Sequence, residues 1–176
     1  MADVKEVLYS VIDSIGREKI RAEVSSDIDS ASRKYCKEIV QKCRRSLGEG
    51  DEELGMLCEA LLHFMLTASL LPSERKVTVE GIDLDVVIPS TKSLARNPDK
   101  ALVIQVIKAE SDKGRVVRAA QAQPTRENIW TVSAKSLKIG ARNYSLDDTI
   151  FHYSALISDI RTFLAAKGNR GLKLLH

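Results

Sequence analysis

The chain has 176 residues, a formal net charge of +3, 44% hydrophobic residues and 29% charged residues. These values are typical of one globular domain with enough buried surface to fold without disulfides or structural metals, and they exclude collagen, mucin-like chains and small disulfide scaffolds. The longest apolar run, residues 60–71, is too short and too interrupted to cross a membrane. Because the N-terminus lacks the basic and apolar regions of a signal peptide, we expect a cytoplasmic protein.

The cysteines have no metal-binding spacing. They are Cys36, Cys43 and Cys58. An odd number of cysteines without a CxxC pair indicates reduced, semi-buried thiols, and the three scattered histidines offer no fourth zinc ligand.

The first part of the sequence predicts helices. Apolar spacing predicts helical structure at 3–24, with a break near Gly16, and at 27–46. The most apolar helix is expected from 51 to 70, where Pro72 ends it. We interpret residues 1–50 as a helical N-terminal extension of a single domain.

From Pro72 onward the pattern changes to strands. Strands are expected at 75–80, 82–88, 101–107 and 128–134, and residues 138–144 form a further short strand or a loop. Alternation within 82–88 predicts Leu84, Val86 and Ile88 on one face and Asp83, Asp85 and Val87 on the other. A basic helix is expected at 112–123. A final helix, capped by 147–149, should end at 167–168, leaving a tail at 168–176. The fold class is therefore α/β, with the core in residues 51–167.

Positive charge gathers in residues 100–146, which hold nine basic and three acidic side chains. Such a local excess indicates a phosphate-binding surface, although a solvated face balanced by the acidic N-terminal half explains it equally well. The candidate nucleic-acid-binding residues are Lys113, Arg115, Arg118, Arg126 and Lys138.

The segment from Glu80 to Lys108 carries the candidate chemistry. Asp83 and Asp85 lie on one expected strand, and the next strand contains Gln105 and ends at Lys108. Neighbouring strands of this kind can hold a carboxylate and an amide around one magnesium ion, with the lysine stabilising charge on a phosphate.

These residues resemble the PD-(D/E)xK superfamily, which includes restriction endonucleases and archaeal Holliday-junction resolvases. The resemblance implies a mixed sheet flanked by helices, action on DNA with Mg²⁺, and a homodimer for duplex cleavage. It makes Asp85 the first metal-binding aspartate, with Asp83 as the competing choice, and Glu59 a helical addition to the metal site. Gln121 matches a helical glutamine that faces the site in some members.

The sequence departs from the family motif on the expected strand 101–107. The family has an acidic residue two positions before the lysine, where this chain has Val106. Gln105 is three positions before Lys108, so the two side chains should point to opposite faces unless a bulge intervenes. Either the site is rearranged, or the fold survives without cleavage.

Each candidate also has a plain structural interpretation. Asp83, Asp85, Glu59 and Lys108 fit solvated surfaces, and Gln105 fits a hydrogen bond to a nearby loop. His63 and Trp130 fit the core better than a ligand or a base-stacking role. Three functions remain: a metal-dependent phosphodiesterase with Asp85, Gln105 and Lys108 as catalytic residues, an inactive nuclease-like DNA-binding subunit, and a protein–protein adaptor.

Overall fold

Five strands form one mixed sheet in the order β1-β2-β3-β4-β5 in the computed structural model, which describes residues 3–173. The first two neighbouring pairs are antiparallel and the last two are parallel. The strands are β1 (Glu74–Val79), β2 (Ile82–Ile88), β3 (Leu102–Ile107), β4 (Ile129–Ser133) and β5 (Arg142–Ser145). The expected α/β class with a mixed sheet is confirmed.

The helices are α1 (Val4–Ile15), α2 (Arg17–Ser26), α3 (Ile28–Leu47), α4 (Asp51–Ala68), α5 (Thr91–Arg96), α6 (Lys113–Ala122) and α7 (Leu156–Lys173). Short 3-10 turns lie at Pro98–Lys100, Glu110–Asp112, Arg126–Asn128 and Tyr153–Ala155. Most bounds fall within a few residues of those that the sequence predicts.

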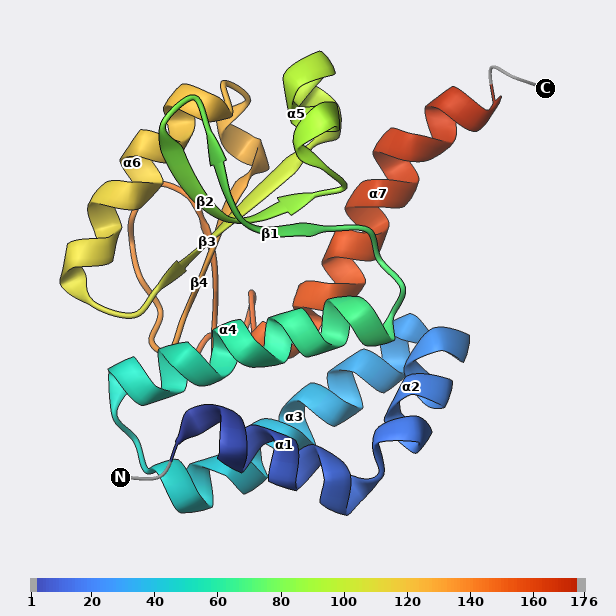
Figure 1. Ribbon diagram of the computed structural model, residues 1–176, viewed down its shortest axis with the longest axis vertical. Coiled ribbons are helices and arrows are strands. Elements are labelled where there is room, and N and C mark those ends of the chain that lie inside the picture. The colour runs from blue at the N-terminus through green and yellow to red at the C-terminus, as the bar shows by residue number, and fades with distance from the viewer. Residues whose placement is uncertain (1–2, 174–176) are drawn as a thin grey trace.

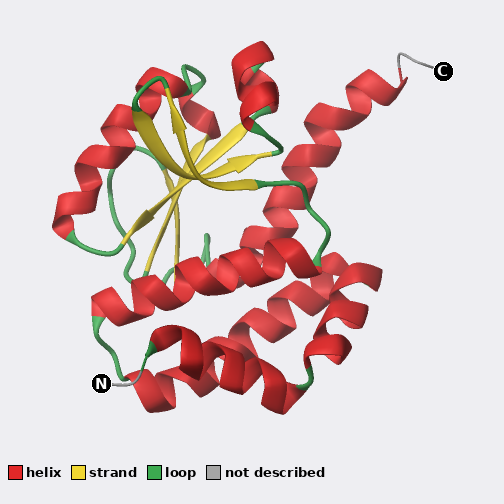
Figure 2. Ribbon diagram, viewed as in Figure 1, coloured by secondary structure: helices red, strands yellow, loops and turns green. Residues whose placement is uncertain are grey.

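Helices cover the sheet on both faces (Figures 1 and 2). The helix α4 crosses the molecule between the sheet and the group formed by α1, α2 and α3, while α6 covers the opposite face. The larger apolar core joins α4 and its neighbouring helices to Val86, Ile104 and Val106 of the sheet. A smaller core under α6 contains Leu84 and Val103.

The alternation predicted for β2 is wrong at one point. Leu84 and Val87 both pack in the core under α6, whereas Val86 and Ile88 pack in the larger core. The slip occurs at Asp85, the one interior position of β2 that is absent from the ladder to β1. A polar side chain held between strands breaks the simple two-residue period.

Both ends of the last helix differ from the prediction. Asp147 and Asp148 do not cap α7, because their carboxylates accept hydrogen bonds from a turn and from Ser136. The helix begins only at Leu156 and continues past Gly168 to Lys173. A glycine costs only about 1 kcal/mol inside a helix, too little to end it. Residues 174–176 of the predicted tail lie outside the described residues.

The core interpretation of Trp130 is confirmed, and the cysteines, which were expected to be semi-buried, are fully buried. Trp130 is buried against Tyr144 and Phe163. All three cysteines are free and buried, and burial raises the pKa of the Cys36 thiol to about 12. None of the described helices is long and apolar enough to span a membrane.

Candidate active site

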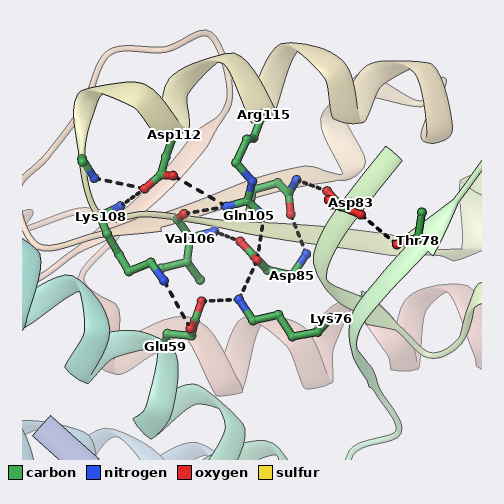
Figure 3. Close-up of polar contacts among 11 residues, drawn as sticks. Glu59, Lys76, Thr78, Asp83, Asp85, Gln105, Val106, Lys108, Asp112 and Arg115 are labelled. Atoms are coloured by element: carbon green, nitrogen blue, oxygen red, sulfur yellow. Dashed lines mark hydrogen bonds and ion pairs between the residues drawn. The ribbon is translucent and has the colours of Figure 1, made fainter. Parts of the chain in front are cut away.

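The strands β2 and β3 stop pairing where the polar residues begin. Their ladder covers Val86–Ile88 and Leu102–Ile104. Beyond it, the Gln105 side chain accepts a hydrogen bond from the Asp85 amide at 2.7 Å and donates one to the Asp83 carbonyl at 3.0 Å. The Asp85 carboxylate in turn accepts from the Val106 amide at 2.8 Å. Side chains therefore replace the backbone ladder and fill the split between the strands (Figure 3).

Asp85 is the central carboxylate of this split and is only 1% exposed. Its Oδ1 accepts from Arg115 at 2.7 Å and from Lys76 at 3.0 Å. Burial alone would raise the pKa of Asp85, but the hydrogen bonds from Arg115, the Val106 amide and Lys76 outweigh it and hold that pKa below its ordinary value. Asp85 is thus an ionised carboxylate ringed by donors.

Glu59 and Lys108 come to the same place from two other elements. Glu59, on α4, is 3.5 Å from the Lys108 ammonium and 3.1 Å from that of Lys76. The Asp112 carboxylate accepts from the Lys108 and Ala109 amides, which fixes the backbone just after β3. The Lys108 side chain also lies against Gly55 of α4, where an added Cβ would be 3.0 Å from its Cγ. Packing therefore directs the lysine toward Glu59.

Lys76 is the site residue that the sequence analysis missed. A two-residue turn at Glu80-Gly81, with both φ angles positive, joins β1 to β2 and sets their register. Because Val79 pairs with Ile82 and Val77 with Leu84, Lys76 lies opposite Asp85. Counting back from Gly81 would have found this pair.

The ammonium of Lys76 stays charged in this setting. Burial would lower the pKa of Lys76, but hydrogen bonds to Asp85 and Glu59 outweigh burial and raise it above its ordinary value. The Lys76 ammonium therefore remains protonated between the two carboxylates.

Two clefts meet at these residues. One, of about 460 Å³, is lined by Asp83, Asp85 and Arg115, and the other, of about 660 Å³, is lined by Glu59 and His63. Lys76 and Lys108 line both clefts. Burial and the nearby Arg75 lower the pKa of His63 to about 4, so this half-buried imidazole is neutral at neutral pH.

The remaining predicted site residues have other contacts. The Asp83 carboxylate accepts from the Thr78 hydroxyl at 2.7 Å, on the side of the hairpin away from Glu59 (Figure 3). Gln105 uses both ends of its amide on the β2 backbone. Val103 and Ile107 pack in the core under α6, whereas Val106 packs in the core of α4. Alternation along β3 therefore puts Gln105 on the α6 face, while Lys108 contacts Gly55 of α4. Gln121 is exposed on α6.

The predicted nucleic-acid-binding residues are divided between two ends of the sheet. Arg115 points inward to Asp85, and Lys113 pairs with Glu110 at 2.9 Å. Arg118 is exposed beside Asp83 and Arg115 in a cleft of about 290 Å³. Lys138 is exposed after β4. Arg126 is exposed. It lies near the start of β3, since the nearby Gln123 side chain donates hydrogen bonds to the Pro98 and Ala101 carbonyls there.

The donor set matches the preferences of magnesium in chemistry. Mg²⁺ is bound by one or two carboxylates and keeps several waters. Carboxylate oxygens of Asp85 and Glu59 converge on one point, at 3.0 Å and 3.1 Å from the Lys76 nitrogen, so a cation already stands between them. Among the described residues, no cluster of three or more acidic, histidine or cysteine ligands occurs. Asp85 and Glu59 are the residues that could hold a metal ion if Lys76 moves away, and Arg115 remains on Asp85 Oδ1.

Comparisons with known proteins agree with this architecture. No protein-family model and no curated protein matches the sequence. Among solved structures, the restriction endonuclease PspGI in complex with substrate DNA has 15% identity and a TM-score of 0.56, with 94% of each chain covered. Metal-depleted Ecl18kI in complex with uncleaved, modified DNA has 10% identity and a TM-score of 0.57, covering 94% of this chain and 80% of that one. The chain has a restriction-endonuclease-like fold.

Proposed function

We propose that this protein is a Mg²⁺-dependent phosphodiesterase that acts on DNA as an endonuclease. The observation that carries the proposal is the meeting of Asp85, Glu59 and Lys108, from three different elements, at one pair of open clefts. A buried carboxylate between β2 and β3 and a packed lysine just after β3 suit metal-assisted phosphodiester hydrolysis.

DNA is the substrate class that the fold favours. The similar structures of PspGI and Ecl18kI both contain DNA. Residues 100–146 carry a net charge of +6, and Arg118 lies exposed beside the cleft that contains Asp85. Two chains with one site each match the two strands of a duplex, so the proposal includes a homodimer.

The chain's own residues have distinct roles in this reaction. Asp85 and Glu59 would hold the metal ion, which when bound supplies a Lewis acid and an activated water. Lys108, held beside Glu59, would stabilise negative charge on the phosphoryl oxygens. Arg115 would keep Asp85 ionised and oriented. Gln105 positions Asp85 by holding its backbone amide.

The test is cleavage of labelled single-stranded, duplex and four-way-junction DNA with Mg²⁺ or Mn²⁺. We compare the wild type with Asp85→Asn, which keeps the side-chain shape, and with Asp83→Asn, a carboxylate on the same strand that contacts Thr78. We expect metal-dependent products that fall by at least about 100-fold in D85N and persist in D83N. If D83N is the inactive variant, Asp83 is the metal ligand instead.

Other outcomes would favour the alternatives. Salt-sensitive DNA binding without cleavage in the wild type would indicate an inactive DNA-binding subunit, for which Val106 in the acidic position is the supporting observation. Neither cleavage nor binding would leave the protein–protein adaptor. Light scattering at about 39 kDa, twice the 19.5 kDa chain, tests the homodimer.

A further inference from the structure

The Lys76 ammonium lies where the two candidate metal ligands converge. It is 3.0 Å from Asp85 Oδ1 and 3.1 Å from Glu59 Oε2, and it is the basic group that touches both carboxylates. Of these two carboxylates, Arg115 contacts Asp85 and not Glu59, and Lys108 contacts Glu59 and not Asp85. The Lys76 ammonium therefore occupies the space that a divalent ion would need in order to bind both carboxylates.

Of these three basic side chains, Lys76 is the easiest to displace. Its side chain is 54% exposed, compared with 29% for Lys108 and 21% for Arg115. Lys108 is also packed against Gly55, and Arg115 lies over the strand split with further contacts to Val106 and Asp112. If Lys76 leaves, Asp85 keeps its hydrogen bonds from Arg115 and the Val106 amide, and Glu59 keeps Lys108, so neither carboxylate loses all its partners.

We propose that Lys76 is a built-in competitor of the divalent cation: its ammonium neutralises Asp85 and Glu59 while the metal is absent and must swing out before the metal binds. This inference rests on the proposed function, because it concerns the same two carboxylates. Its consequence is weak metal affinity in the free protein. A phosphate group that draws Lys76 away would strengthen metal binding, so metal and DNA would bind cooperatively.

The test measures Mn²⁺ binding to the purified chain by isothermal titration calorimetry, without DNA and without turnover. Lys76→Met removes the charge and keeps an apolar chain of similar length. We expect K76M to bind Mn²⁺ about tenfold more tightly than the wild type or better, since a unit charge a few ångströms away is lost. Lys76→Gln should behave in the same way, which guards against a folding defect in one variant.

Matched controls locate the effect. Lys92→Met removes one exposed lysine on α5 and should leave Mn²⁺ affinity at the wild-type value. Lys76→Arg keeps the positive charge, so its Mn²⁺ affinity should stay as weak as that of the wild type. Asp85→Asn combined with K76M should cancel the gain, because it removes one of the two ligands. A K76M or K76Q affinity equal to or weaker than that of the wild type would overturn the proposal, as would a gain that survives D85N.

Failure of this inference is distinct from failure of the proposed function. If the wild type cleaves DNA with Mg²⁺ but K76M binds Mn²⁺ no more tightly, Lys76 is not the competitor and the endonuclease stands. If K76M gains affinity but no form of the chain cleaves DNA at saturating metal, the competition is real and the proposed activity falls.

Discussion

The Gln105 amide joins two strands and leaves no polar atom of its own unpaired. Its oxygen accepts from the Asp85 amide, and its nitrogen donates to the Asp83 carbonyl, in a fully buried position. A glutamate in its place could accept the first hydrogen bond but could not donate the second. Its charge would also face the buried Asp85. This pairing suits an amide and not a carboxylate at position 105.

Gln105→Glu tests this role. We expect Q105E to lower the free energy of unfolding by about 2–4 kcal/mol at neutral pH, because an acceptor faces an acceptor and a charge is buried. Protonation restores a donor, so the loss should shrink as the pH falls. Urea unfolding across pH provides the measurement.

The control for this substitution is Gln121→Glu, an exposed glutamine on α6 whose replacement should change stability by less than about 0.5 kcal/mol. A Q105E protein as stable as Q121E at neutral pH would show that the amide does not hold the strands together.

At the scale of elements, the close approach of α4 to the end of β3 builds the site. Gly55 lies on α4 directly against the backbone and side chain of Lys108. Glu59 follows one turn later on the same helix and therefore faces the Lys108 ammonium. The spacing between helix and strand thus sets the distance between a candidate ligand and the candidate catalytic lysine.

Gly55→Ala should disturb this spacing. Its added Cβ would meet Lys108 Cγ at 3.0 Å and Cα at 3.2 Å, closer than ordinary packing allows. We expect G55A to lose about 1–3 kcal/mol of stability and to reduce DNA cleavage, since Lys108 must shift. Thermal unfolding and the cleavage assay measure both effects.

Gly114→Ala on α6 provides the comparison, because nothing lies within 4 Å of its added Cβ. An alanine there should stabilise the helix by up to about 1 kcal/mol. Equal stability changes in G55A and G114A would mean that the contact with Lys108 carries no constraint.

At the scale of the whole molecule, the folded chain places two of the predicted DNA-binding arginines, Arg118 and Arg126, in different positions relative to the cleft that contains Asp85. Arg118 is exposed next to the cleft residues Asp83 and Arg115. Arg126 lies near the residues that precede the N-terminal end of β3, whereas Lys108 follows the C-terminal end of that strand. Only the first of these two arginines is suited to contact a phosphate backbone that crosses the site.

Arg118→Ala should therefore weaken DNA binding by roughly three- to tenfold and reduce the salt dependence by about one ion. Arg126→Ala should stay close to the wild type. Fluorescence anisotropy at several salt concentrations measures both. If R126A weakens binding as much as R118A, DNA extends to the far end of the sheet.

Much of the fold was predictable because local physics controls it. Apolar spacing placed α3 and α4, and the alternation and turn residues placed β1 and β2. The part of the site on one strand was predictable too, as Asp85 was. The pairing of Lys76 with Asp85 was also predictable, because the turn at Gly81 fixes the register of β1 against β2.

The sequence by itself determined most element types and the α/β class, since these follow from periodicity and turns. Only the tertiary structure decided that Lys76 also contacts Glu59, that Gln105 binds backbone, and that Arg115 turns inward. These contacts join residues as far as 30 positions apart in the sequence. Their geometry depends on how helices pack on the sheet, and no local pattern encodes that.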